Sequence, residues 1–288
     1  MKNVDLDLTS IGYKVNTLED LKLWVPAAFS KIAHPERTDK YTHFSTEDFL
    51  EAFEEIGWHF YAGKQHGANP YSRHIIHLQS ENTQTIEVNG EKFRPTLILD
   101  NSHDGYTPAQ IHLGLYRLKT SCGLVLEVPG LNNTVKFRHV GENKKQLVQI
   151  ISEIAGQYET VAKHLQNMAN FKLTEDQKKV LAYKAISLRE PNRFQDAEGN
   201  PDLKEICKSM EIEDLYEPLR PGEEANDLWT VFNIIRERTV EGKYERKSKA
   251  GRKAAPRVIT NAARHLNYNK KLWASVEELM PVEDAVSA

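Results

Sequence analysis

The residues that most directly suggest chemistry are His103 and Asp104, which are adjacent in the polar segment NSHDGYT at residues 101–107. An imidazole beside a carboxylate can bind a metal ion or transfer a proton. However, the chain has no HExxH motif and no CxxC pair, and Asn, Ser, Asp and Gly also form turns by hydrogen-bonding to their own backbone. We therefore interpret the segment as a structural corner, with a metal-dependent enzyme around His103 and Asp104 as an alternative. A further ligand for such a metal would be His74, His77 or His112.

Other catalytic patterns are weaker. Cys122 lies in the apolar segment TSCGLVL, and an apolar environment raises the pKa of a thiol and so lowers its reactivity. The chain has neither GxGxxG nor GxxxxGK[ST], the glycine-rich motifs that bind nucleotide phosphates. We assign no catalytic residue, no metal and no cofactor.

The chain has a formal net charge of −3, but its positive charge is concentrated toward the C-terminal end. Residues 236–271 contain twelve Lys and Arg against three Glu, whereas residues 272–288 contain four acids and no base. The densest segment, GKYERKSKAGRKAAPR at 242–257, has seven bases, one acid, two glycines and a proline. Glycine and proline disfavour a helix interior, so we predict a mobile basic loop here. A solvated surface without a ligand is the other interpretation of such a run.

A second group of bases is predicted to lie on a sheet. In IHLGLYRLK, residues 111–119, alternation places Arg117 and Lys119 on one face of a strand, and KFRHV at 136–140 adds another basic patch. Lys and Arg side chains follow phosphates, while Tyr, His and Phe offer faces on which bases stack. Together with a flexible basic loop, this pattern is typical of a protein that binds single-stranded nucleic acid.

These bases must be positioned by a sheet, which the middle of the chain predicts. The segment STEDFLEAFEEIGW begins a helix at Ser45 or Thr46, either of which can cap it, and places acidic residues in the first turn. The segments that follow are alternating or β-branched, and Asn89-Gly90 between two of them is a strong hairpin signal. We predict strands at residues 73–79, 84–88, 92–99 and 111–128.

The chain after Gly141 is predicted to be mainly helical. Apolar residues of segment 142–171 recur at helical spacing over about seven turns, which predicts one long helix. Thr174 should cap the next helix, and Asn226 or Asp227 should begin another that ends at Gly242. Residues 189–202 are polar and are predicted to form an exposed loop.

Blocks of helix, sheet and helix indicate an α+β fold, with an antiparallel sheet packed by a long helix and a mainly helical C-terminal part. We divide the chain into an irregular arm at 1–44, an α+β core at 45–170 and a helical part at 171–288 that carries the basic loop 242–257. No apolar run approaches the roughly 18 residues that span a bilayer. The N-terminal segment is acidic where a signal peptide is apolar, and the two cysteines are far apart. We therefore expect a cytoplasmic protein without a membrane partner.

The segment LDNSHDGYTPAQIHLGLYRLKTSCGLVL, residues 99–126, resembles the phage- and plasmid-borne family known as domain of unknown function 932, the phage/plasmid-like proteins. The resemblance covers about residues 45–275 and continues through segments 136–140, 228–244, 251–257 and 267–273. It implies a role in mobile elements, which enter cells as single-stranded DNA. The order of helix, antiparallel sheet and long helix is also similar to the core of the RecT/Redβ/Erf-type single-strand annealing proteins, which implies rings or filaments.

We therefore expect a single-stranded DNA-binding protein of a phage or mobile element that forms a homo-oligomer and anneals strands. Its affinity should fall steeply with salt and depend little on sequence. The alternative from another class is an interaction protein that inhibits or modulates a host protein through the basic loop. The predicted nucleic-acid-binding residues are Arg117, Lys119, Lys136, Arg138, His139, Lys243, Arg246, Lys247, Lys249, Arg252, Lys253, Arg257, Arg264 and Lys270.

Overall fold

The chain forms two compact units. Unit 1 comprises Met1–Ala162 with Thr260–Ala262, and unit 2 comprises Lys163–Ile259 with Ala263–Ala288. The division falls inside α4 (Tyr158–Asn170), and the three-part division predicted at residues 44 and 170 stays a prediction. The computed structural model describes residues 13–31, 34–35, 45–104, 108–118, 122–126, 128, 131, 133–137, 144–248 and 250–280.

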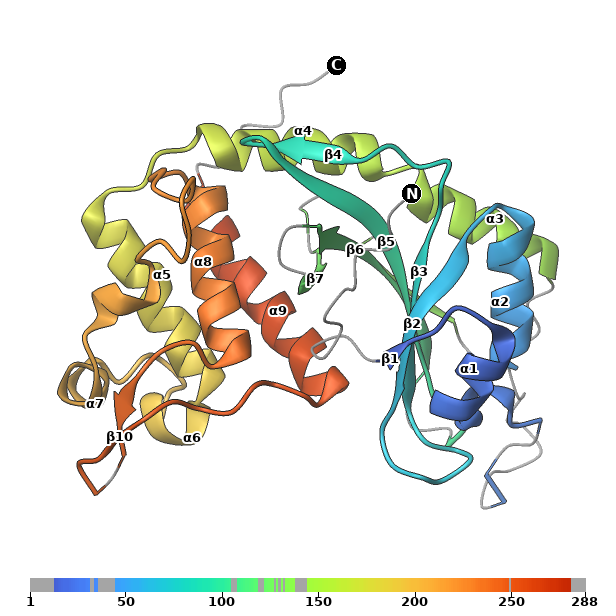
Figure 1. Cartoon of the computed structure of the whole chain (residues 1–288), viewed down its shortest axis with the longest axis horizontal. Helices are drawn as coiled ribbons and strands as arrows, with labels where there is room; N and C mark the ends of the chain where they lie inside the picture. Colours follow the sequence, from blue (N-terminus) through green and yellow to red (C-terminus); the bar gives the residue numbers. More distant parts are fainter. Residues whose placement is uncertain are drawn as a thin grey trace. The chain divides into compact units, whose positions relative to one another are not determined.

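Unit 1 is built on an antiparallel sheet with the strand order β1-β2-β3-β5-β6-β7, in which β4 also pairs with β5 and β8 with β6 (Figure 1). The α+β class and the antiparallel sheet predicted from the sequence are confirmed. The strands are β1 (Tyr13–Lys14), β2 (His59–Gln65), β3 (His74–Gln79), β4 (Ile86–Val88), β5 (Glu91–Asn101), β6 (Ala109–Arg117), β7 (Cys122–Val125) and β8 (Thr134–Phe137).

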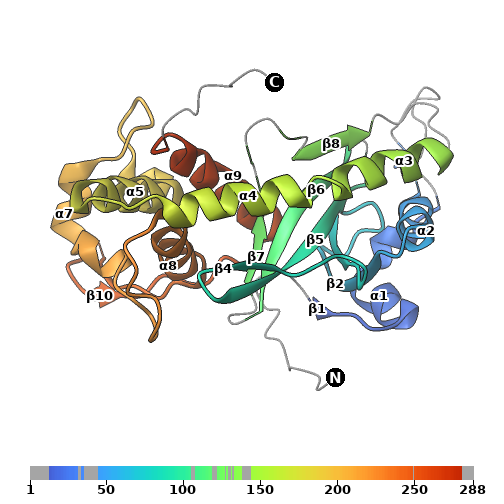
Figure 2. The ribbon, with the colours of Figure 1, turned by 90° about the horizontal axis from the view of Figure 1, so that it is seen from above.

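The helix predicted after residue 45 is confirmed. The Ser45 hydroxyl accepts a hydrogen bond from the Glu47 amide at 3.1 Å, and the carboxylates of Glu47 and Asp48 lie in the first turn, where the helix dipole favours negative charge. Phe49 is fully buried, and its ring meets the Phe137 ring edge-on at 5.1 Å. This helix packs against β2 and α3 (Figure 2). The helices of unit 1 are α1 (Leu18–Trp24), η1 (Pro26–Phe29), α2 (Thr46–Glu55) and α3 (Lys144–Ala155).

The turn between β4 and β5 confirms the predicted hairpin. Asn89 has φ 52° and Gly90 has φ 75°, so both residues adopt the left-handed conformation that a type I′ turn requires. The register then places Val88 opposite Glu91. Asparagine and glycine tolerate this conformation better than other residues, so the local sequence alone specifies the turn.

The single long helix predicted over 142–171 is wrong in one respect, because the chain forms two helices, α3 and α4, that separate at Gly156 and Gln157. The Gly156 amide still bonds to the Ser152 carbonyl at 2.9 Å, whereas the Gln157 amide bonds to the Ile154 carbonyl at 3.1 Å. The second bond spans three residues and tightens the turn. The apolar spacing continues across the break, so periodicity does not reveal it.

Tyr158 fixes the start of α4 to the sheet of unit 1. Its buried hydroxyl donates to the Thr96 carbonyl on β5 and lies 3.2 Å from the Gly114 carbonyl on β6. Burial raises the pKa of Tyr158 well above its ordinary value, so the group remains a neutral donor. A Cβ at Gly114 would lie 2.7 Å from Thr96 Oγ1 and 3.0 Å from the Leu124 carbonyl oxygen. Glycine is therefore required where these strands and Tyr158 meet.

Unit 2 is mainly helical, and α5, α8 and α9 lie side by side (Figure 1). Asp227 caps α8 by accepting from the Thr230 amide at 2.9 Å, and Gly242 ends it with φ 69°, as predicted. Thr174 caps α5, also as predicted. Trp273 is fully buried among the aromatic rings of α8. The elements are α5 (Glu175–Arg189), α6 (Pro191–Phe194), α7 (Leu203–Ser209), η2 (Ile212–Leu215), α8 (Leu228–Glu241), β9 (Arg246–Lys247), β10 (Lys253–Ala254) and α9 (Ala262–Glu277).

Two segments of unit 2 differ from their predictions. Residues 189–202 are not a simple exposed loop, because they include α6 with the fully buried Phe194 and a bridge between Gln195 and Pro201. The basic loop 242–257 contains a two-stranded antiparallel hairpin, β9–β10, in which Lys253 pairs with Lys247. In the described part of the chain, no helix combines the length and apolarity needed to cross a membrane.

The close packing around Gly114 makes a specific prediction about stability. Gly114→Ala should lower the free energy of unfolding by about 1–3 kcal/mol, because the added methyl overpacks the contact with Thr96 and the β7 backbone. Urea denaturation checks this. Gly156→Ala is the matched control, since its Cβ would make only ordinary contacts, the nearest at 3.4 Å. Equal stability of the two variants would contradict the assignment of Gly114 as a packing constraint.

Candidate nucleic-acid interface

His103 lies in a buried polar cluster centred on the Thr46 hydroxyl. Thr46 Oγ1 is 2.8 Å from His74 Nε2 and 3.3 Å from His103 Nε2, and it accepts a hydrogen bond from the Asn101 amide at 3.0 Å. His74 Nδ1 lies 2.9 Å from the Ser72 carbonyl, which makes Nδ1 the donor and Nε2 the acceptor. Burial lowers the pKa of His74 to about 4, so the ring is neutral at physiological pH. The cluster joins the start of α2 to the sheet.

Asp104 is partly exposed and accepts a hydrogen bond from the Ser102 hydroxyl at 2.6 Å. This bond joins two side chains of the segment, and the Asn101 side-chain oxygen accepts a further bond from the Ser102 amide at 2.8 Å. Across the residues with described positions, no group of three or more His, Cys, Asp or Glu side chains is arranged to hold a metal ion. The contacts of His103 with Thr46 and of Asp104 with Ser102 hold the local fold together.

Among the bases predicted to form an exposed patch on the sheet, Arg117 is buried instead. Arg117 is only 3% exposed, because both faces of β6 are buried, and its guanidinium makes two hydrogen bonds to the Glu91 carboxylate at 2.7 and 2.8 Å. Arg117 therefore closes an internal ion pair and does not face a ligand. Lys136 is exposed on β8. Four further predicted residues lie outside the described residues, namely Lys119, Arg138, His139 and Lys249.

The β9–β10 hairpin presents the predicted bases to solvent. Lys247, Arg252 and Arg257 are exposed, and within the described residues none of their side chains forms an ion pair. Lys253 is 75% exposed and lies 3.4 Å from Glu245. The Ser248 amide bonds to the Arg252 carbonyl at 2.7 Å and closes the turn. The structure therefore places Lys247, Arg252 and Lys253 on the hairpin and Arg257 in the segment directly after it.

The end of α5 holds both sides of this hairpin. The buried Arg189 guanidinium donates to the Thr239 carbonyl of α8 at 2.8 Å and to the Arg257 carbonyl at 2.5 Å. Glu190 accepts from Arg246 Nε at 2.7 Å and from the Tyr244 hydroxyl at 3.0 Å. Arg246 is thus a structural residue at the base of the hairpin.

Lys243 belongs to a second ion-pair network. The Glu237 carboxylate is 1% exposed and accepts hydrogen bonds from Arg220 at 2.5 and 3.0 Å and from Lys243 at 2.9 Å. Burial alone raises the pKa of Glu237, but the hydrogen bonds from Arg220 and Lys243 outweigh burial and lower the pKa to about 2. Lys243 also pairs with Glu241 at 2.5 Å. Its charge is neutralised within the fold.

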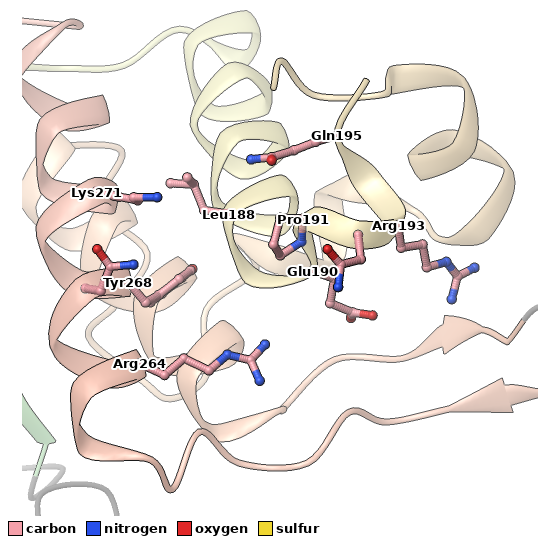
Figure 3. Close-up of a pocket in the computed structure, with 10 residues that line it drawn as sticks. Leu188, Glu190, Pro191, Arg193, Gln195, Arg264, Tyr268 and Lys271 are labelled. Atoms are coloured by element: carbon pink, nitrogen blue, oxygen red, sulfur yellow. The ribbon is translucent and has the colours of Figure 1, made fainter. Parts of the chain in front are cut away.

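A cavity of about 520 Å³ lies between α9 and the α5–α6 corner (Figure 3). Arg264, Tyr268 and Lys271 contribute from α9 and face residues 188–195 (Figure 3). Arg264 was predicted as a site residue, and it lines the cavity. The other cation that α9 contributes to the cavity is Lys271, not the predicted Lys270. The sequence interpretation missed the opposite wall because it treated 189–202 as an exposed loop. The residues of that wall are Leu188, Glu190, Pro191, Asn192, Arg193 and Gln195.

Comparisons with known proteins agree with the resemblance seen in the sequence. The model of the family described as "Domain of unknown function (DUF932)" matches residues 33–273. The chain is similar to the UPF0380 proteins YafZ and YfjQ of Escherichia coli (strain K12), each 26% identical over 270 residues, covering 92% of this chain and 91% of the relative. No solved structure matches.

The Glu190 contacts predict how the hairpin is held. Glu190→Ala should loosen β9–β10, because it removes the acceptor for both Arg246 and Tyr244, and should raise the rate of tryptic cleavage after Lys247 and Arg252 about tenfold. Limited proteolysis followed by mass spectrometry measures this. Glu198→Ala removes an exposed carboxylate from the same unit and serves as the control. Equal cleavage of the two variants would show that Glu190 does not hold the hairpin.

The lowered pKa of Glu237 predicts a pH dependence of stability. The folded pKa of about 2 is below the ordinary value of the unfolded chain, so the ionised carboxylate stabilises the fold above about pH 4.3. This contribution is lost as the pH falls toward 2, with a slope of at most about 1.4 kcal/mol per pH unit.

Urea denaturation at several pH values measures this slope. Glu237→Gln should be less stable than the parent protein at pH 7 and should lose less stability on acidification, because the titrating group is gone. Glu198→Gln, which changes an exposed carboxylate, should keep the parental slope. An unchanged slope in Glu237→Gln would contradict the assignment.

Proposed function

The chain belongs to the family described as a domain of unknown function, DUF932, and we propose from the geometry of unit 2 that it binds single-stranded DNA. The observation that carries the proposal is the β9–β10 hairpin with the segment that follows it, where Lys247, Arg252 and Arg257 are exposed and, within the described residues, form no ion pair. Other bases of the same segment are neutralised by Glu190, Glu237 and Glu241. Unneutralised cations on a projecting ribbon are suited to bind phosphates.

The physical driving force is the release of counterions from the nucleic acid. Each phosphate contact made by Lys or Arg displaces condensed cations, so affinity depends strongly on salt and little on sequence. A two-stranded ribbon can follow a phosphate backbone without reading base edges. The preference for a single strand is supported by the cavity beside the hairpin, because an unpaired nucleotide can enter it and a stacked base pair cannot. Arg193 connects the two features by donating to the Lys247 carbonyl at 2.8 Å.

We further propose that the protein is cytoplasmic, that it belongs to a phage or other mobile element, and that it anneals strands as a homo-oligomer. These parts extend the binding function and rest on the resemblance of the sequence. An acidic surface of a host protein is the competing ligand for the same hairpin, and the binding experiment distinguishes it.

Fluorescence anisotropy of labelled single-stranded and double-stranded DNA, at roughly 50 and 200 mM salt, tests the proposal. Single strands should bind more tightly than duplexes, and their affinity should fall steeply between the two salt concentrations. The triple variant Arg252→Ala, Lys253→Ala, Arg257→Ala should bind more weakly, and the slope of log affinity against log salt should decrease by about two, because three phosphate contacts are lost.

The matched control removes the same charge elsewhere in unit 2. Lys172→Ala, Lys179→Ala and Lys204→Ala together replace three solvent-accessible lysines that do not lie beside the hairpin and should leave the salt slope near the parental value. Equal affinity for duplex and single strand would contradict the single-strand preference. Absence of DNA binding at low salt would overturn the proposal and leave an acidic protein partner as the ligand of the hairpin.

A further inference from the structure

We infer that the α6–α9 cavity, lined by α9 and residues 188–195, holds one unstacked nucleotide, with Arg264 and Lys271 on its two flanking phosphates. If the bound nucleotide is part of a DNA strand, this inference rests on the proposed DNA-binding function. The recognised chemistry is a nucleoside that carries phosphate on both its 5′ and its 3′ side.

The spacing of the two cations supports this ligand. Arg264 and Lys271 are seven residues apart on α9, which places them on the same helix face about 10 Å apart along the axis. Tyr268 lies between them on that face, and all three residues line the cavity (Figure 3). A single phosphate needs one such cation, whereas two cations at the ends of one cavity suit a ligand with anionic groups at both ends and an uncharged middle.

The wall between the cations fits the uncharged middle. Leu188 and Pro191 face α9 across the cavity, and Tyr268 contributes only a small part of its ring, since the residue is 3% exposed and its hydroxyl bonds to Thr239 Oγ1 at 2.6 Å. A sugar or base can pack on these surfaces. The amide side chains that line the same space can donate to and accept from the edge of a base. These amides are Asn192, Gln195 and Asn267.

The local charge also favours an anion. Glu190 is the one carboxylate among the lining residues, and it is neutralised by Arg246 at 2.7 Å. Lys271 is exposed and forms no ion pair within the described residues. Arg264 donates a hydrogen bond to the Arg189 carbonyl at 2.9 Å, which helps to orient its guanidinium. Arg193 points away from α9 toward Ser209 and the hairpin backbone, so it is not assigned to the ligand (Figure 3).

The volume is consistent with this assignment. Small-molecule sites in proteins have volumes of roughly 300–1,000 Å³, and the cavity of about 520 Å³ lies inside this range. It is also partly open to solvent along Lys271 and Asn267, whose side chains are exposed. The strand on either side of the bound nucleotide could therefore leave the cavity without breaking the fold.

Isothermal titration calorimetry with thymidine, thymidine 5′-monophosphate and thymidine 3′,5′-bisphosphate tests the inference on the full chain. Affinity should rise in that order, by about tenfold for each phosphate, because each forms charge-assisted hydrogen bonds with a different cation. Lys271→Ala should weaken the bisphosphate about tenfold, so that it binds the variant about as tightly as the monophosphate binds the parent protein.

Controls separate this inference from the proposed function. Lys204→Ala removes an exposed lysine of the same unit that does not line the cavity, and it should leave all three affinities unchanged. If the bisphosphate binds but single-stranded DNA does not, the cavity is a site for a free nucleotide and the strand-binding proposal fails. If DNA binds, but the bisphosphate binds no better than thymidine and Lys271→Ala has no effect on it, the inference about the cavity is overturned and the hairpin proposal stands.

Discussion

The contacts of Arg189 determine the arrangement of unit 2. A buried cation is costly unless it is hydrogen-bonded, and this guanidinium donates to the carbonyls of Thr239 and Arg257. The first acceptor lies in the last turn of α8, where carbonyl groups lack partners within the helix and favour a positive charge. The carbonyl of Arg189 then accepts from Arg264 at the start of α9. One residue thus joins the end of α5 to α8, to the segment that follows the hairpin and to α9.

The basic residues of unit 2 divide into two groups with different physical roles. Arg189 is buried and hydrogen-bonded, and Arg246 is held by Glu190, so their charges stabilise contacts inside the fold. Arg252 and Arg257 are exposed, and they define the charge that a ligand meets. A net charge counted from the sequence treats all of them alike. The local excess of bases is therefore larger than the excess available at the surface, and the available part lies on the hairpin and along α9.

Local interactions made much of the fold predictable from the sequence. The Ser45 cap, the Asn89-Gly90 turn and the Asp227 cap each depend on a few neighbouring residues, and all three are confirmed. Arg117 was misplaced because its partner Glu91 lies on the neighbouring strand, 26 residues away, and only the register of β5 and β6 brings them together. The cavity was missed for the same reason, since its two walls come from segments that are far apart in the sequence. Hydrophobic spacing alone does not distinguish an exposed strand face from one covered by another element.

Unit 1 is formed by two separate segments of the chain, and this affects when each unit can be completed during synthesis. Residues 260–262 belong to unit 1, although they follow most of unit 2 along the chain. Within unit 1, Lys64 donates to the Thr260 carbonyl across 196 positions, and His66 lies 3.1 Å from the Asn261 amide nitrogen. Domains generally fold in the order in which the ribosome delivers them. Here the first unit is completed only after most of the second has emerged, so unit 2 is synthesised as an insertion inside a partly assembled unit 1.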